Sequence, residues 1–335
     1  MRVGIIDLEK GTGFPNIPLM KISAWHKQQG DTVEWYEPLF SGHMDIVYVS
    51  KVFSFTPEYQ YYIDADKVIK GGSGYCIGLK DGKEIYHKEK DKELPPEIEH
   101  IYPDYSIYFN DRDVIYDENT GECLGLSRAE KVKRDTAYGF LTRGCPNACE
   151  FCIVCEKEGR CSIKVADLSE FWRGQKNIVL LDPNMFACRD WRELSEQLIK
   201  SGAWIDFSQG CDMRLMTEEK AEYLKRMKIK RIHFAWDKYE DKDMIIPKFK
   251  AFKDITGWDK RKLVVYVLVN FKTTLEQDLE RIYTLKELGY WPYVMVYQKD
   301  KLPKKHVLRR MQRWVNMRSI FESVPTFEEY LQGKR

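Results

Sequence analysis

The sequence has no long hydrophobic run. Its longest apolar stretch, residues 263–269, has the length of a strand, whereas a membrane-spanning helix needs roughly 20 apolar residues. The first residues form a short apolar segment followed by charges, without the longer apolar core of a signal peptide. We therefore expect a cytoplasmic protein that makes no use of a membrane.

An excess of charge of one sign is also missing. The 54 Lys and Arg residues are almost balanced by 52 Asp and Glu residues, which gives a formal net charge of +2. Such a chain has no strong overall attraction to nucleic acid or to an anionic surface, so binding of nucleic acid is possible but not indicated. With 335 residues, of which 43% are hydrophobic, the chain is long enough for two domains with a substantial core.

The nine cysteines are unevenly distributed. Five of them lie between residues 145 and 161, and the other four are scattered along the chain. A disulfide framework is not expected in a cytoplasmic protein, because thiols are kept reduced in that compartment. Crowding of this kind therefore favours a metal site.

The first hundred residues alternate between strands and a helix. We expect strands at residues 2–8, 32–36, 45–50 and 66–69, and a helix that begins near Pro18 and ends at Gly30. This rhythm predicts an α/β fold with a doubly wound parallel sheet. The sequence then becomes charged and irregular, so we assign residues 1–100 to a front domain and residues 101–134 to a connector.

The second half has a more regular alternation of strands and helices. Strands are expected at residues 136–142, 177–181, 204–208, 231–236, 263–271 and 293–297, and helices at residues 167–172, 190–201, 217–227, 243–256 and 274–288. Six such units in succession predict a partial (β/α)6 barrel over residues 135–335, with its chemistry at the carboxyl ends of the strands.

Three cysteines directly follow the first strand of this predicted barrel. Cys145, Cys149 and Cys152 have the spacing C-x3-C-x2-C, and the aromatic Phe151 precedes the last of them. Three thiolates can ligate three irons of a [4Fe–4S] cluster and leave the fourth iron open to a small molecule. A zinc site completed by Cys155 and a chance grouping of cysteines are the alternatives, while the spacing differs from that of a bacterial ferredoxin.

In this segment the chain resembles the radical SAM superfamily, whose signature is C-x3-C-x-aromatic-C after the first strand of a partial TIM barrel. The resemblance implies that S-adenosylmethionine (SAM) chelates the open iron. It also implies an electron donor such as flavodoxin or ferredoxin, whose electron releases a 5′-deoxyadenosyl radical that abstracts hydrogen from a substrate. The substrate is unknown. A methyl- or methylthio-transferase acting on RNA or a small molecule, and a non-catalytic iron–sulfur redox or sensing protein, remain as alternatives.

The resemblance also suggests residues that contact SAM. Asp182 or Asn184 stands where most members of the family have a Gly-Gly-Glu-like motif that holds the SAM amino group. The alternative is that Asp182, Pro183 and Asn184 only form a turn. Gln209 begins a stretch that resembles Gln-Gly-x-Asp-x-Arg and ends at Arg214. An arginine can pair with the SAM carboxylate through two parallel hydrogen bonds, although Arg214 could equally pair with Asp212.

Two further SAM contacts are suggested by position alone. Asp237 ends the fourth predicted barrel strand, where it could bind the ribose hydroxyls, and Asn270 ends the fifth, where it could meet other polar groups of SAM. Both assignments follow from the rule that ligands of parallel α/β folds bind at the carboxyl ends of the strands.

The front domain resembles the Rossmann-like cobalamin-binding domain that precedes the barrel in one radical SAM class. The Asp-x-His-x-x-Gly motif that supplies a cobalt ligand is absent, and His26 and His43 are the histidines that accompany the predicted strands and helix. Cobalamin binding is therefore possible but not expected, and we interpret His26 as a packed residue.

Two further features have plain explanations. Four cysteines besides the motif could face the barrel mouth, but they are scattered over three loops, so we expect a single cluster. They are Cys155, Cys161, Cys188 and Cys211.

The basic residues between positions 299 and 318 could mark an RNA surface. Their spacing favours an amphipathic closing helix.

Overall fold

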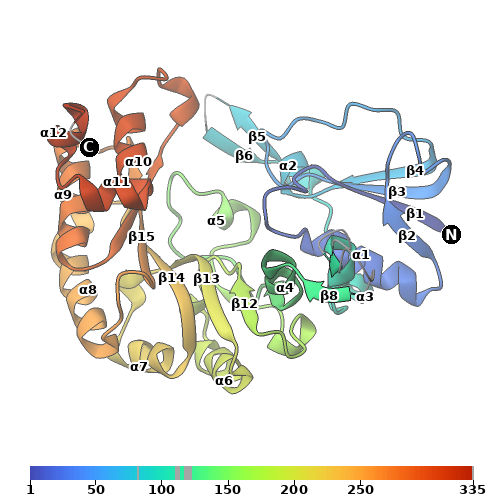
Figure 1. The fold of residues 1–335 in the computed structure, drawn as a ribbon, viewed down its shortest axis with the longest axis horizontal. Helices are drawn as coiled ribbons and strands as arrows, with labels where there is room; N and C mark the ends of the chain where they lie inside the picture. The colour runs from blue at the N-terminus through green and yellow to red at the C-terminus, as the bar shows by residue number, and fades with distance from the viewer. Residues whose placement is uncertain (81–82, 110–113, 117–122, 334–335) are drawn as a thin grey trace. The chain divides into compact units, whose positions relative to one another are not determined.

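The computed structural model describes residues 1–80, 83–109, 114–116 and 123–333. It divides into two compact units, Met1–Val179 and Leu180–Arg335, and Figure 1 shows the elements of each. The division falls within strand β12 (Asn177–Leu180). Part of the predicted connector lies outside the described residues. Among the residues described, no helix has the length and apolar character needed to cross a membrane.

The first unit is built on a parallel four-stranded sheet. Its strands are ordered β2-β1-β3-β4, with β1 at Arg2–Asp7, β2 at Thr32–Trp35, β3 at Met44–Ser50 and β4 at Ala65–Gly71. Helix α1 (Ile17–Gln28) joins β1 to β2, and the Asn16 side chain caps it by accepting a hydrogen bond from the Leu19 amide. The predicted parallel sheet and the helix are thus confirmed.

The two faces of this sheet are covered differently. Leu19 and Ile22 of α1 pack with Ile5 on one face, whereas Tyr59 and Ile63 of the β3–β4 loop pack against the cluster that contains Val47 on the other. The described connections from β2 to β3 and from β3 to β4 contain no helix. The β2–β3 connection, residues 36–43, is shorter than the dozen or so residues that a helical crossover takes. A sheet wound by helices on both faces is therefore not shown.

Short elements complete the first unit. They are α2 (Ser73–Cys76), β5 (Ile77–Lys80), β6 (Lys83–Tyr86), α3 (Pro96–Glu99), β7 (Val114–Tyr116), β8 (Cys123–Leu126), α4 (Arg128–Arg134), β9 (Thr136–Gly139), β10 (Thr142–Arg143), α5 (Val154–Lys157) and β11 (Ile163–Lys164). The expected strand over residues 136–142 is divided between β9 and β10. The expected helix over residues 167–172 is only a 3₁₀ turn, Leu168–Glu170. The chain leaves the helical conformation at Phe171. The ring of Phe171 packs closely over Gly139, so that a Cβ added to Gly139 would lie 2.4 Å from the ring carbon Cγ.

The second unit alternates parallel strands with helices. Strands β13 (Trp204–Cys211), β14 (Lys228–Ala235), β15 (Leu263–Val269) and β16 (Trp291–Val296) are parallel neighbours in that order. The helices are α6 (Trp191–Ser201), α7 (Glu218–Arg226), α8 (Lys242–Thr256), α9 (Leu275–Glu287), α10 (Val307–Asn316), α11 (Arg318–Ser323) and α12 (Phe327–Leu331). The α/β class with parallel sheets is confirmed, and closure into a barrel stays a prediction.

Helices pack on one face of these strands. Phe234 of β14 is fully buried and contacts the rings of Phe249 and Phe252 on α8. The closing helix α10 buries its apolar side chains, Leu308, Met311, Trp314 and Val315. The expectation of an amphipathic helix in the basic segment is therefore confirmed, whereas an RNA surface there stays untested.

Candidate functional site

The three motif cysteines lie in one closed loop of the first unit. Strand β9 leads into β10, and β10 pairs with β11 in antiparallel register, with Thr142 opposite Lys164 and Arg143 opposite Ile163. This short ladder holds the ends of the segment 144–162 together. Cys145, Cys149 and Cys152 all belong to this segment, which we call the cysteine loop.

Polar contacts across its base shape the cysteine loop. One carboxylate oxygen of Glu158 accepts a hydrogen bond of 2.8 Å from Arg143, and the other accepts one of 3.2 Å from the Gly144 amide. Gly144 has a φ of 82°, and a Cβ at this position would lie 2.2 Å from the carbonyl oxygen of Cys161. Only glycine fits such a close approach in the left-handed region.

The thiol of Cys155 is bonded to the backbone of the cysteine loop. It accepts a hydrogen bond of 3.1 Å from the Ala148 amide and donates one of 2.9 Å to the carbonyl oxygen of Cys145. Ala148 has a φ of 43°, so the turn between the first two motif cysteines is tight. Cys155 therefore fixes the path of this turn.

The motif thiols lie close enough to influence one another. Burial raises the pKa of the Cys152 thiol to about 11, and the neighbouring thiols of Cys149, Cys145 and Cys155 add to the shift. The amide of Cys152 also donates a hydrogen bond of 3.0 Å to the carbonyl oxygen of Cys149. Such a thiol would lose its proton only with a positive charge beside it, as a bound metal provides.

The arrangement of the motif thiols differs from that of a site for a single metal ion. Within the described part of the chain, no group of three or more His, Cys, Asp or Glu side chains is placed to hold a single metal ion. The thiolates of a four-iron cubane bind different irons, so they stand further apart than the ligands of one ion. Three soft thiol ligands from one loop, with Cys155 already engaged by the backbone, suit the donor set of such a cubane.

Apart from Phe151, which lies in the cysteine loop, the predicted SAM contacts belong to the second unit, where they lie at or just beyond the carboxyl ends of strands. Asp182 and Asn184 follow β12 and are buried, with exposed fractions of 5% and 1%. The negative charge of Asp182 lies near the buried thiol of Cys211 and helps to raise its pKa, after burial itself. Gln209 is exposed within the last part of β13.

Arg214 is engaged by acidic side chains in this structure. Its Nε donates a hydrogen bond of 2.8 Å to Asp212 and its Nη2 donates a second of 3.1 Å, while Asp241 lies 3.6 Å from Nη1. The alternative that Arg214 pairs with Asp212 is therefore what the structure contains. To bind a SAM carboxylate, the guanidinium would have to exchange this partner.

Asp237 follows β14, and the pKa of its carboxyl group is raised. Burial raises its pKa to about 6, while the positive charges of Arg281 and Arg214 oppose the shift. Arg281 is fully buried and donates hydrogen bonds to the carbonyl oxygens of Trp236 at 2.6 Å and Asp237 at 3.1 Å. Sequence reasoning missed Arg281. A detectable signal was a charged pair, Asp278 and Arg281, at buried positions of an amphipathic helix.

Asn270, which follows β15, has a structural task. Its Nδ2 donates a hydrogen bond of 2.9 Å to the carbonyl oxygen of Tyr297, beyond the end of β16. Its φ of 68° lies in the left-handed region, where asparagine is among the more tolerated residues. Its side-chain amide thus links two neighbouring strand ends.

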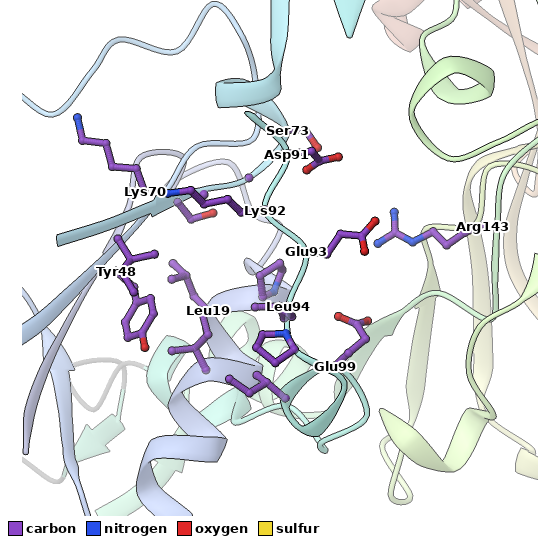
Figure 2. A pocket seen from close by; sticks show the side chains of 18 of the residues that line it. Leu19, Tyr48, Lys70, Ser73, Asp91, Lys92, Glu93, Leu94, Glu99 and Arg143 are labelled. Carbon is purple, nitrogen blue, oxygen red and sulfur yellow. The ribbon is translucent and has the colours of Figure 1, made fainter. Parts of the chain in front are cut away.

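A large cavity lies within the first unit, beside the base of the cysteine loop. It has a volume of about 1040 Å³, and its lining includes Leu19 of α1, Tyr48 of β3, Lys92 and Arg143. Figure 2 shows charged side chains, among them Lys92, Glu93 and Arg143, around the apolar Leu19 and Leu94. Apolar walls with charged groups at several points are typical of a binding pocket for a small molecule.

Two histidines of the first unit, His26 and His43, form contacts with neighbouring side chains. His26 is 1% exposed, and its ring nitrogens hydrogen-bond with Asp31 at 2.7 Å and Tyr48 at 3.0 Å. The interpretation of His26 as a packed residue is confirmed. His43 is exposed and pairs with Asp64 at 2.8 Å. Binding of cobalamin stays untested.

Comparison with known proteins gives a structural likeness but no match to a family or a curated protein. No family model matches the sequence, and no curated protein matches it. The chain is similar to SuiB of Streptococcus suis, in a crystal structure of that protein bound to S-adenosylmethionine. The two are 14% identical, the match covers 62% of this chain and 52% of that chain, and the TM-score is 0.37. The likeness thus spans about half the length of SuiB.

Proposed function

We propose that this chain is a radical SAM enzyme that binds a [4Fe–4S] cluster and cleaves S-adenosylmethionine by one-electron reduction. The observation that supports this most is the cysteine loop. Cys145, Cys149 and Cys152 have the spacing C-x3-C-x2-C, and the closed loop that carries them follows β9 and β10. Three thiolates leave one iron of a cubane open to a small molecule.

The residues of the cysteine loop would have distinct roles. Cys145, Cys149 and Cys152 would be the three ligands, and Cys155 would hold the turn at Ala148 through its two backbone hydrogen bonds. When bound, the cluster would supply the electron that cleaves SAM, after reduction by a donor such as flavodoxin or ferredoxin. Burial around Cys152 would keep bulk water away from its thiolate.

Polar residues of the second unit would bind SAM. Arg214 would exchange Asp212 for the SAM carboxylate, because a guanidinium forms the same forked pair with either partner. The Asp237 carboxyl, held at the end of β14 by the Arg281 contacts, would accept hydrogen bonds from the ribose hydroxyls. Asp182, Asn184, Gln209 and Asn270 remain further candidates on the grounds of their positions, as does Phe151 of the cysteine loop.

A reconstitution experiment tests the proposal. The full chain is loaded with iron and sulfide without oxygen, reduced with dithionite and incubated with SAM. We expect about four irons per chain and the formation of 5′-deoxyadenosine that depends on both the reductant and the cluster. Protein that carries a reducible cluster but yields no 5′-deoxyadenosine would favour the non-catalytic iron–sulfur alternative.

A further inference from the structure

Polar side chains gather on the sheet face of the second unit that points away from the helices. Phe234 of β14 packs against α8, and the buried Ile232, two residues earlier, shares that face with Phe207, its partner in the ladder. Successive side chains of a strand point to opposite faces, so Asp206 and His233 lie on the other face. Tyr266 of β15 joins them there, because its ring stacks on that of His233 with centroids 5.0 Å apart and planes 9° apart.

Hydrogen bonds fix the orientation of both rings. His233 Nδ1 lies 2.7 Å from the carbonyl oxygen of Phe207, which can only accept, so Nδ1 carries the hydrogen. In the neutral imidazole, Nε2 is then an acceptor, and no described residue donates to it. The Tyr266 hydroxyl donates a hydrogen bond of 2.8 Å to the carbonyl oxygen of Ser208. The face thus presents an imidazole in a single tautomer.

Asp206 has a carboxyl group that no described residue satisfies. Its side chain is 16% exposed, and its Oδ1 is enclosed without a hydrogen-bond partner. His233 Nδ1 lies 3.8 Å from this oxygen, which is too far for a hydrogen bond. Buried polar groups without partners are rare in native proteins. Burial raises the pKa of Asp206, and the nearby charges of His233, Arg231 and Lys230 oppose this shift.

A bulge in β13 opens the sheet at the same place. The pairing of β13 with β14 shifts between Phe207 and Cys211, so the intervening residues leave the regular ladder. Ser208 is held at the bulge by its own hydrogen bond of 2.8 Å to the Leu180 carbonyl oxygen and by the bond from Tyr266. The next residue, Gln209, is exposed. Bulges of this kind often redirect side chains beside active sites.

Apolar surface continues from the polar pair across the sheet. Tyr293 of β16 is 42% exposed and meets the ring of Tyr266 edge-on, with centroids 5.8 Å apart. Met295, two residues along the same strand, is 47% exposed. This surface would suit the flat or apolar body of a ligand whose polar head reaches Asp206 and His233.

We propose that Asp206 and His233 form a binding subsite for the ammonium or hydroxyl head of a small molecule with a flat or apolar body. A carboxylate oxygen and the His233 Nε2 lone pair both accept hydrogen bonds, so the ligand must donate them. A carboxylate or phosphate head would be repelled by the Asp206 carboxylate, because like charges repel at short distance. The identification of this ligand as the substrate rests on the proposed function, whereas binding itself does not.

Three probes that share a phenylethyl group and differ in their head group test the subsite: phenethylamine, 2-phenylethanol and 3-phenylpropionate. Each is added to the full chain after reconstitution of the cluster and without reductant. The ¹⁵N resonance of His233 Nε2 is the measurement, assigned by its loss in His233→Gln. We expect saturable shifts with the amine or the alcohol and none with the carboxylate. Asp206→Asn should weaken amine binding about tenfold, the loss typical of a hydrogen bond to a charged group. The matched control is Glu322→Gln, which changes an exposed carboxylate of the same unit.

The probe measurements can overturn the proposed subsite independently of the proposed function. Equal or stronger shifts with 3-phenylpropionate, or no shift with any probe, would overturn the subsite. Amine binding that is unchanged in Asp206→Asn would remove Asp206 from it. Because the probe measurements need no SAM cleavage, full 5′-deoxyadenosine production without probe binding would refute the subsite alone. Probe binding without SAM cleavage would refute only the proposed function.

Discussion

The guanidinium of Arg281 donates a hydrogen bond of 2.6 Å to the carbonyl oxygen of Trp236, one residue beyond the end of β14. A second bond of 2.8 Å reaches the carbonyl oxygen of Leu268 in β15. Asp278, one turn before Arg281 on α9, accepts a third at 2.5 Å. One fully buried side chain thus joins two strands near the point where the predicted SAM contacts begin.

Removal of this guanidinium should destabilise the second unit. Arg281→Met would leave the Asp278 carboxylate buried without its partner, and breaking a buried ion pair in this way typically costs about 3–5 kcal/mol in the free energy of unfolding. Denaturant unfolding measures the change. Arg261→Met serves as the control, because its pair with Asp259 is on the surface, where solvent screens it and its contribution to stability is small. Equal effects of the two substitutions would show that the buried bonds contribute little.

The Asp237 carboxyl should make the stability of the chain depend on pH. Burial raises its pKa from 3.8 to about 6 in the folded state, so the folded state binds the proton more tightly. The stabilisation from this proton is complete below about pH 4 and is lost as the pH rises through about 6. Relative to Asp237→Asn, the wild-type chain should lose on the order of 2–3 kcal/mol across this window. A constant difference between the two proteins from pH 4 to pH 7 would contradict the assignment.

Each motif cysteine should be indispensable for the cluster. Replacement of Cys145, Cys149 or Cys152 by Ala removes one of three ligands, so iron content and 5′-deoxyadenosine formation should both fall to background. Cys161→Ala is the matched control, because Cys161 belongs to the same loop but is exposed. Full activity of Cys149→Ala would overturn the proposed function.

Cys155 should affect the loop without serving as a ligand. Cys155→Ala is expected to keep about four irons per chain and SAM cleavage. Its lost bonds to Ala148 and Cys145 should nevertheless lower the thermal stability of the protein. Cys155→Ser, whose hydroxyl can make the same two bonds, should recover part of this loss. A halved iron content in Cys155→Ala would instead mean that this thiol is a ligand.

Arg214 should set the affinity for SAM. Arg214→Lys cannot reproduce the forked contact of a guanidinium, and SAM binding should weaken by about 1.5–3 kcal/mol, as for a hydrogen bond to a charged group. Calorimetry with the reconstituted protein gives the affinity, and the iron content should not change. Arg192→Lys is the control, because Arg192 forms a comparable forked pair with Glu219 on the surface. If both variants bind SAM with the affinity of the wild type, the role of Arg214 is limited to its ion pair with Asp212.

Local signals in the sequence were sufficient to predict most helices of the second unit. Thr274 and Gln277 form a capping box at the start of α9, and Thr217 caps α7 through the Lys220 amide. Gly202 ends α6 in the left-handed conformation. These features depend on residues within one turn of each other, so they can be read from the sequence alone.

Features that depend on distant contacts could not be predicted in this way. The helix expected over residues 167–172 fails because the ring of Phe171 packs over Gly139, far away in the sequence. The Asp206–His233 pair and the Arg281 contacts likewise join residues of separate elements. The positions of Asp237 and Asn270 at strand ends were predictable, but the pairing of Arg214 with Asp212 could only be left as one of two alternatives.

The closed base of the cysteine loop has a consequence for how a metal centre would assemble. Pairing of β10 with β11 and the bonds of Glu158 to Arg143 and Gly144 are made by the polypeptide itself. The conformational entropy of closing the loop is then lost during folding. The three thiols would act as a preorganised chelate, in which the first thiolate that binds brings the next two to a high local concentration.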